Sequence, residues 1–567
     1  MSAKILGIWS TWSMRNGLLT MVWVFMFSIG FSQNHTVGLL SFDPDRSFPG
    51  FNLVFPHNQS TVFLLNNCGQ FVQSWTDEAN FRPGNAVYLR EDGTLLKTKR
   101  EADSNLDPIW FGGGGEIVEI RGWDNSLLWS FSLNDSLARL HHDVTPLPNG
   151  NILMIAWELR TREEAIMAGR DPDLLTDDDL LPEYIFEMDP AQDSIVWEWR
   201  VWDHLIQDYD GNKENFGVVH DHPELIDLNF DTNNGIRDWL HCNAIDYNAE
   251  LDQIMLCIPT FGEVWIIDHS TTSVEAAGHS GGRSGRGGDL LYRWGNPQTY
   301  RQGDAEDQIL FFPHDAHWVD RNLKVDHPDY GKILIFNNRI NELYSTVELL
   351  NPIFDSSVWN YSFSEDSLWW SIRPDKTIMH PDTFSLHSTA VSSAQILNNE
   401  NILILSGRTG YAFELTPDGS VVWEYKVPLA AGKPVAQGDT LATNQNFTFR
   451  LNRYPEDFAA FENRDLSSRG FIELEPDSSY CDQILPAIEI DLTNINIFPN
   501  PVQNHVTIVS NIAHPVSIEV SDLIGHSLYS DQLTAMGEQV ISTTDWPSAL
   551  YLVRINGIVT SKILVVD

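Results

Sequence analysis

The sequence predicts an all-β protein in which one four-stranded unit repeats around a ring, followed by a small β-sandwich. Three observations carry this prediction. The chain of 567 residues contains 20 tryptophans, and large aromatic side chains that recur along a chain are typical of repeated strand packing. A phrase of strand, histidine and turn returns through the centre of the chain. Beyond residue 491 the sequence changes to short alternating strands separated by turns.

The repeated phrase, between residues 33 and 485, is a strand ending in tryptophan, a histidine, and an Asn-rich turn leading into an apolar strand. Its copies join Trp129 to His141 and His142, Trp199 to His241, Trp294 to His314, and Trp359 or Trp370 to His387. One such unit cannot bury both of its faces, so a closed ring is the stable arrangement. We therefore predict a β-propeller with six blades, with five or seven as alternatives. The helix-forming stretch from Arg162 to Gly169 is predicted to be an insertion.

The last segment, residues 491–567, is predicted to be the β-sandwich. Residues Ile495, Ile497, Phe498, Ile518, Val520, Tyr551 and Val553 are expected to point inward. The Phe498–Pro501 step, the Asp522–Gly525 step and the terminal run from Lys562 to Val566 resemble the C-terminal sorting domain of the type IX secretion system. This resemblance implies the type IX machinery as a partner and a secreted or cell-surface location.

The first segment, residues 1–32, is predicted to be a secretory signal peptide. Lys4 and Arg15 precede an apolar stretch that runs from Leu18 to Phe31, and small residues stand before Gln33. A membrane anchor is the alternative, but this stretch is shorter than the roughly 20 residues that span a bilayer. We therefore expect export with cleavage and no stable membrane span.

The composition excludes disorder and argues against nucleic acid as a partner. Hydrophobic residues make up 42% of the chain and charged residues 20%, which is typical of folded proteins. The formal net charge of −43 would repel a phosphate backbone. Four cysteines are too few for a disulfide framework, although a single bridge, for instance between Cys242 and Cys257, stays open.

The histidines stand at one phase of four repeats, just before the inner hairpin, so we expect their imidazoles to converge on one axial funnel. Four imidazoles with an open position could bind a metal. With an arginine, they could equally serve as nucleophile, general acid and anion clamp for a tetrahedral group. Arginine favours sulfate or phosphate because its planar fork donates paired hydrogen bonds.

The stretch from Asp238 to Asn248, with the segments around Asp268, Arg293, His314 and Asn337, resembles the bacterial arylsulfotransferase family. The resemblance covers about residues 36–480 and implies a six-bladed propeller. It also implies transfer of a sulfuryl group from an aryl sulfate donor to a phenolic acceptor through a sulfohistidine, with no nucleotide, metal or other cofactor.

The resemblance also suggests site residues. His387 lies in the region of the family nucleophile, and His241 and His314 match funnel histidines that bind the sulfuryl oxygens or protonate the leaving oxygen. Arg339 stands where the family arginine is expected to clamp sulfate. Expected substrate-binding residues are His142 and His317, which are in phase or adjacent, and Asn338.

Two other functions stay open. A non-catalytic propeller could bind glycans or protein at the surface, with its histidines serving the structure alone. A quinone-dependent dehydrogenase propeller also repeats tryptophan, but there the tryptophan follows a docking phrase of Asp or Thr and Gly, whereas in this chain a histidine follows the aromatic strand.

Overall fold

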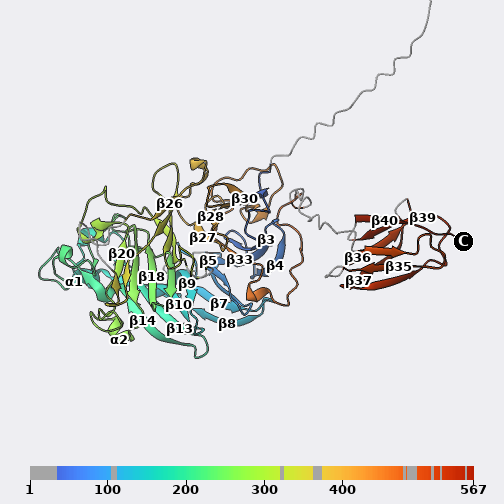
Figure 1. Cartoon of the computed structure of the whole chain (residues 1–567). Coiled ribbons are helices and arrows are strands. Elements are labelled where there is room, and N and C mark those ends of the chain that lie inside the picture. Colours follow the sequence, from blue (N-terminus) through green and yellow to red (C-terminus); the bar gives the residue numbers. More distant parts are fainter. Residues whose placement is uncertain are drawn as a thin grey trace, which may run out of the picture. The chain divides into compact units, whose positions relative to one another are not determined.

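The computed structural model describes residues 35–103, 112–319, 323, 325–361, 373–476, 481, 495–511, 516–523, 526–555 and 558–566. Regular structure in these ranges is mostly antiparallel β-sheet (Figure 1). The predicted signal peptide lies outside the described residues, as does Trp370 of the fourth repeat. No helix within the described ranges is long and apolar enough to cross a membrane.

Six sheets of the described chain are each built on four antiparallel strands, ordered from the inner to the outer strand of each blade. Blade 1 is β33 (Thr448–Pro455), β2 (Gly50–Pro56), β3 (Thr61–Asn66) and β4 (Phe71–Thr76). Blade 2 is β5 (Phe81–Leu89), β6 (Leu95–Glu101), β7 (Ile117–Arg121) and β8 (Leu127–Ser132). Blade 3 is β9 (Ala138–Pro146), β10 (Ile152–Glu158), β13 (Glu183–Asp189) and β14 (Ser194–Arg200).

The other three blades follow in chain order. Blade 4 is β17 (Ala244–Asn248), β18 (Gln253–Ile258), β19 (Glu263–Asp268) and β20 (Tyr292–Trp294). Blade 5 is β21 (Pro313–Trp318), β22 (Ile333–Asn337), β23 (Thr346–Leu350) and β26 (Lys376–Ile378). Blade 6 is β27 (Ser393–Ile396), β28 (Ile402–Ser406), β29 (Tyr411–Leu415) and β30 (Val421–Lys426), with β1 (Gly38–Phe42) added at its outer edge.

The inner strands close a ring. Strands β33, β5, β9, β17, β21 and β27 each contact the next one, and β27 contacts β33 again. The ring is closed by pairing of β33 with β2, so that blade 1 combines segments from both ends of the repeat region. The prediction of a six-bladed β-propeller is confirmed.

The recurring tryptophans link neighbouring blades. Trp423 on β30 donates a hydrogen bond to the Asn67 carbonyl of blade 1, and Trp75 on β4 donates to the Gly122 carbonyl of blade 2. Trp199 on β14 donates to the carbonyl of Gly288, beside blade 4. Each of these indoles is fully buried, so the outer strands use tryptophan both to fill the space between blades and to satisfy a backbone acceptor.

Insertions add short elements to the ring. The predicted helical insertion is confirmed as α1 (Arg162–Ala168), which begins with a capping box between Thr161 and Glu164 and ends at Gly169 with a φ of 104°. The remaining short elements are α2 (Ser273–Ala276), β11 (Arg160–Thr161), β12 (Asp179–Leu180), β15 (Leu205–Ile206), β16 (Ile226–Asp227), β24 (Phe354–Asp355), β25 (Asn360–Tyr361), β31 (Leu429–Ala430) and β32 (Lys433–Pro434).

One disulfide joins Cys68 to Cys481, across 413 residues of sequence. Cys242 and Cys257 are free and buried, so the bridge that their spacing left open does not form. Although Ala244 pairs with Cys257 across the sheet, Cys242 precedes β17 and its Sγ lies toward the Ala244 carbonyl. The cysteines that do form the bridge lie far apart in sequence, and spacing gives no signal for such a pair.

The C-terminal segment folds as two sheets with a common core. One sheet orders β34 (Ile495–Phe498), β35 (His505–Ser510) and β38 (Glu538–Ser542). The other orders β37 (Ser527–Leu533), β36 (Val516–Ser521), β39 (Leu550–Ile555) and β40 (Ile558–Leu564). The expected inward residues pack against or within the core, except Phe498, which is 51% exposed. Phe498 follows Ile497 directly, and adjacent strand residues point to opposite faces.

Candidate active site

A cavity of about 500 Å³ lies on the propeller axis. Every blade contributes to its wall; the main side chains, in blade order, are His57, Phe447 and Phe449, then Asn85 and Arg100, then His142, His241, His314 with Arg339, and finally Val391 with Arg408. Three arginines and four histidines therefore surround one hollow, together with the aromatic ring of Phe312.

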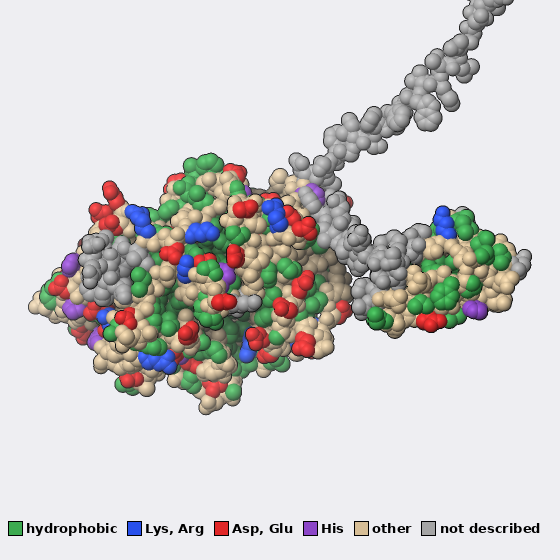
Figure 2. All heavy atoms as spheres, in the orientation of Figure 1, with side chains coloured by type: hydrophobic (Ala, Val, Ile, Leu, Met, Phe, Trp, Pro, Cys, Tyr) green, Lys and Arg blue, Asp and Glu red, His purple; other side chains and the backbone are tan. Residues whose placement is uncertain are grey.

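The cavity differs from the outer surface in charge. The face shown in Figure 2 carries scattered acidic side chains, in line with the net charge of −43. Among the described residues, however, no aspartate or glutamate lines the cavity. Cationic guanidinium groups without acidic neighbours in the wall favour an anionic ligand.

Three of the predicted histidines meet in this cavity, from three successive blades. The ring centroids of His142 and His241 lie 4.5 Å apart, and the ring of Phe312 contacts both His241 and His314. His142 and His241 have φ values of 52° and 55°, a left-handed conformation that is uncommon for residues other than glycine. Such backbone is typical of sites where a side chain must be aimed at a fixed point.

His241 keeps one ring nitrogen for the cavity. Its Nδ1 lies 2.5 Å from Asp238 Oδ2, and within the described chain Nε2 makes no hydrogen bond. Asp238 is 4% exposed. The carboxylate fixes the tautomer with the proton on Nδ1, which leaves the Nε2 lone pair available, and it stabilises an imidazolium if the ring gains charge.

His314 has both ring nitrogens engaged. Its Nδ1 donates to Asn338 Oδ1 at 2.7 Å, and its Nε2 accepts the backbone N–H of Val391 at 3.0 Å. Burial lowers the pKa of His314 to about 3, so the ring is neutral near pH 7. Asn338 lies behind His314, where it orients the ring and does not line the cavity.

Two arginines stand side by side at the cavity wall. Arg339 donates from Nε to the Thr389 carbonyl at 2.8 Å, and its guanidinium carbon lies 3.6 Å from the centroid of the Phe312 ring. Arg408 donates from Nη1 to Thr389 Oγ1 at 2.7 Å. Burial, and then the neighbouring charge of Arg408, lower the pKa of Arg339. A bound anion would relieve this repulsion.

Two predicted residues lie away from the cavity. His387 is half-buried, and it is not among the cavity residues; its carbonyl accepts the Ser406 hydroxyl. In blade 6, the segment that reaches the cavity is Ala390 and Val391, several residues after His387. His317 lines a second cavity of about 670 Å³ and contacts the Asp315 carbonyl instead.

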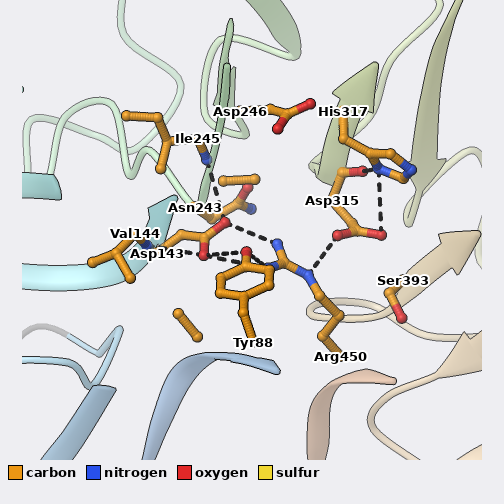
Figure 3. Close-up of polar contacts among 12 residues, drawn as sticks. Tyr88, Asp143, Val144, Asn243, Ile245, Asp246, Asp315, His317, Ser393 and Arg450 are labelled. Carbon is orange, nitrogen blue, oxygen red and sulfur yellow. Dashed lines mark hydrogen bonds and ion pairs between the residues drawn. The ribbon is translucent and has the colours of Figure 1, made fainter. Parts of the chain in front are cut away.

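Arg450 lines this second cavity and joins the inner strands of several blades (Figure 3). On β33, it pairs with Asp143 of β9, at 2.9 Å between Nη2 and Oδ2, and with Asp315 of β21, at 2.6 Å between Nε and Oδ1. Tyr88 of β5 donates to the same Asp143 at 2.8 Å. Side chains from four blades thus meet in one buried cluster.

The same acidic residues connect each blade to the next. Asp143 accepts the backbone N–H of Ile245, Asp246 accepts that of Trp318, and Asp315 accepts that of Ala394. These carboxylates replace backbone hydrogen bonds that inner strands of separate sheets cannot make to each other. This cluster holds the inner strands, and with them the histidines, at fixed positions.

Several site residues were not predicted from the sequence. Arg408 follows the end of β28 by two residues, as Arg339 follows the end of β22, and this common offset was the available signal. Asp238 precedes His241 by three residues. His57 and Arg100 carried no signal because their blades lack the full repeated phrase.

Comparisons with known proteins agree with this architecture. The arylsulfotransferase (ASST) family model matches residues 126–426, which is 301 of 567 residues. The secretion system C-terminal sorting domain matches residues 496–566. No curated protein matches the chain.

Three solved structures are similar at low identity. A protein of unknown function from Bacteroides caccae is 12% identical, over 71% of this chain and 98% of its own, with a TM-score of 0.39. Virginiamycin B lyase from Staphylococcus aureus is 9% identical, over 70% and 89%, with a TM-score of 0.29. The Cps50 (Swd1) β-propeller domain from Myceliophteria thermophila is 9% identical, over 69% and 90%, with a TM-score of 0.32. Likeness at this distance assigns no function to the chain.

Proposed function

The chain belongs to the arylsulfotransferase family, and on that basis we propose that its axial cavity transfers a sulfuryl group from an aryl sulfate to a phenol. The observation that carries the proposal is the cavity wall itself, in which Arg100, Arg339 and Arg408 face neutral imidazoles with no acidic residue among the described lining. Phe312, Phe447 and Phe449 offer apolar surface for an aromatic ring beside these anion-binding groups.

In the donor half-reaction, His241 is the nucleophile. Its Nε2 lone pair attacks sulfur, an N–S bond forms, and the bond from sulfur to the aryl oxygen breaks with its electron pair going to that oxygen. Asp238 stays hydrogen-bonded to Nδ1–H and offsets the positive charge that the ring acquires. The arginines stabilise the negative oxygens of the transferring group.

In the acceptor half-reaction, the oxygen of a phenol attacks the same sulfur. The N–S bond breaks, its electron pair returns to His241 Nε2, and the phenolic proton leaves. The two half-reactions make a ping-pong cycle with no nucleotide donor and no need for a metal ion.

His314 is the second candidate for the nucleophile. Asn338 fixes its proton on Nδ1, so its Nε2 also carries a lone pair, but the Val391 N–H must release that nitrogen first. His387, the nucleophile expected from the resemblance, would need to move into a cavity that it does not line.

The sorting domain indicates that the protein is exported to the cell surface or the medium. We assign residues 1–32 to a cleaved signal peptide, residues 33–485 to the propeller and residues 491–567 to the sorting domain. Small aryl sulfates and phenols are accordingly met outside the cytoplasm, and the type IX machinery is the partner for export.

The test uses 4-nitrophenyl sulfate as donor, with and without phenol. We expect at most one equivalent of 4-nitrophenolate per enzyme without phenol, and continuous release with it. His241→Ala should abolish both phases, whereas His387→Ala should retain them. A sulfuryl adduct mapped by mass spectrometry to His314 would transfer the nucleophile role to that residue. Absence of turnover and of adduct in the wild-type protein would favour a non-catalytic binding propeller.

A further inference from the structure

A chain of buried groups lies behind the cavity histidine His142. Its Nδ1 lies 2.8 Å from Nδ1 of His141, and Nε2 of His141 lies 2.8 Å from Oε2 of Glu183. All three residues are at most 3% exposed. His142 is the only one of the three that lines the cavity.

Local structure explains why two consecutive histidines can serve one chain. Pairing between β9 and β10 shifts its register between Met154 and Ala156, opposite the histidine pair. This bulge and the left-handed φ of His142 let its ring face the cavity. The ring of His141 stacks on Trp157, with centroids 3.9 Å apart, and reaches Glu183 on β13.

Gly113 completes the local fit. A Cβ atom at this position would lie 2.2 Å from Cε1 of His142, and the φ of Gly113 is 61°. The glycine therefore leaves the space that the His142 ring occupies. In the described chain, Nε2 of His142 makes no hydrogen bond, so one ring nitrogen remains available to a ligand.

We propose that Glu183, His141 and His142 form a proton relay that exchanges one proton with the phenolic oxygen bound in the cavity. The relay rests on the proposed sulfuryl transfer and supplies what that reaction still lacks, a group that protonates the leaving oxygen and deprotonates the acceptor. The hydrogen bonds of the chain admit two arrangements that differ by one proton.

In the loaded arrangement, Glu183 is protonated and donates to His141 Nε2, His141 donates from Nδ1–H to His142 Nδ1, and His142 presents Nε2–H to the cavity. During the donor half-reaction, that proton passes to the leaving aryl oxygen. His142 takes a proton from His141, and His141 takes one from Glu183, which becomes a carboxylate. No charge remains on either imidazole.

In the acceptor half-reaction, every transfer runs backward. The phenol gives its proton to His142 Nε2, His142 Nδ1–H passes a proton to His141, and His141 Nε2–H returns one to Glu183. The proton lost by the acceptor therefore equals the proton gained by the previous leaving group. The cycle is balanced without exchange with solvent.

The surroundings of Glu183 allow it to hold and release a proton. Its Oε1 accepts the Cys242 N–H at 2.8 Å, and in the described chain no lysine or arginine pairs with it. Burial raises the pKa of Glu183 well above its ordinary value and lowers those of His141 and His142 well below theirs. The charged and titratable groups facing the chain are Asp238, His241, His314 and Arg139, the last paired with Glu116 at 3.1 Å.

The test compares leaving groups in the donor half-reaction, measured as the single burst of phenol without acceptor. Glu183→Gln keeps a donor toward His141 but cannot give up a proton. Phenolate is a poor leaving group that needs protonation, whereas 4-nitrophenolate is stable without it. We expect the burst rate with phenyl sulfate to fall about 100-fold or more, and the rate with 4-nitrophenyl sulfate to change by less than about fivefold.

Glu187→Gln is the matched control. Glu187 lies on the same strand, pairs with His269 at 2.9 Å, and is not a cavity residue, so this variant should treat both donors as the wild type does. If Glu183→Gln fails to fold, His141→Phe breaks the chain while keeping a ring against Trp157, and the same selective loss is expected.

Two further outcomes separate the relay from the reaction itself. Equal loss with both donors, or none, in a folded Glu183→Gln variant would overturn the relay while leaving sulfuryl transfer intact. Infrared difference spectra offer a readout without turnover: the wild type should show the carbonyl band of a protonated carboxylic acid that Glu183→Gln lacks. Absence of that band overturns the loaded arrangement. A wild type that shows the band but transfers no sulfuryl group overturns the proposed function and, with it, the relay's role.

Discussion

Asp238 and His241, three residues apart, share a hydrogen bond of 2.5 Å between Oδ2 and Nδ1 at the edge of the axial cavity. The pair turns one nitrogen of an imidazole toward the protein and the other toward the ligand. It supplies orientation and charge stabilisation from a single side chain, in the way a carboxylate supports a nucleophilic or basic histidine in other enzymes.

Asp238→Asn should retain the fold and lose most of the activity. An amide can donate its own hydrogen to Nδ1 and thereby favour the tautomer with the proton on Nε2, which cannot attack sulfur. We expect kcat/KM for 4-nitrophenyl sulfate to fall about 10²- to 10⁴-fold. Asp252→Asn, which alters a similar pair with His269 outside the cavity, is the control and should keep wild-type kcat/KM.

Arg408→Ala should weaken donor binding and transition-state stabilisation together. Removing one guanidinium from the anion site costs about 1.5–3 kcal/mol, the value of a hydrogen bond to a charged group, or roughly 10- to 100-fold in kcat/KM. The loss should shrink when sulfate is added to the assay, because free sulfate competes less well for the depleted site. Arg237→Ala, a surface change distant from the cavity lining, should leave kcat/KM unchanged.

Arg450 should be required for stability. Replacing it by Met leaves Asp143 and Asp315 buried without their cation, and breaking a buried ion pair costs about 3–5 kcal/mol. The thermal midpoint of the propeller should drop accordingly. Restoring neutrality with the triple change Arg450→Met, Asp143→Asn and Asp315→Asn should recover part of the loss; equal midpoints for wild type and Arg450→Met would contradict the role given to this cluster.

His269 should make stability depend on pH above neutrality. Burial alone would lower its pKa, but hydrogen bonds to Asp252 and Glu187 outweigh burial and raise the pKa to about 9. The folded state therefore binds this proton more tightly than the unfolded state, whose pKa is near 6.5. The stabilisation is complete below pH 6.5 and is lost as pH rises through 9, with an upper limit of about 3 kcal/mol.

The measurement compares denaturation midpoints at pH 6 and pH 10 for wild type and His269→Gln. The wild-type midpoint should fall more between these two values than that of the variant. A variant with the same pH dependence as the wild type would show that other groups carry it.

The disulfide should stabilise the propeller. Serine at Cys481 removes the bond to Cys68, and loss of a native disulfide typically costs about 2–5 kcal/mol. The thermal midpoint of Cys481→Ser should match that of the reduced wild type, and reductant should no longer shift it. Cys257→Ser is unsuitable as a control because that residue is fully buried.

Much of the fold followed from local chemistry. Tryptophan at the outer strands of blades 3, 4 and 6 marked the repeat because each blade must cover its neighbour with a large side chain. The closing strand β33 carried no repeat phrase, since it pairs with a segment about 400 residues earlier. Pairing across such distances is decided by topology, which periodicity does not encode.

The site was foreseen in part for a similar reason. His142, His241 and His314 share a phase, and the inner strands carry that phase to the axis. In blade 6 the chain enters β27 through Val391 and Ser392, both with positive φ. This entry places Val391 at the cavity and leaves His387 outside it. Arg450 and Glu183 were missed because a single buried charge has no period and is recognised only by the partners that surround it.

The ring closure has a consequence for the life of the chain. Strand β33 brings Arg450 and completes blade 1, so a polypeptide released before residue 455 has neither a shut circle nor a cation to neutralise Asp143 and Asp315. Synthesis proceeds from the other end, and sulfuryl transfer must therefore wait until almost the whole propeller has left the ribosome. Incomplete copies are inert by construction, and the cytoplasm is spared a transferase that has not finished folding.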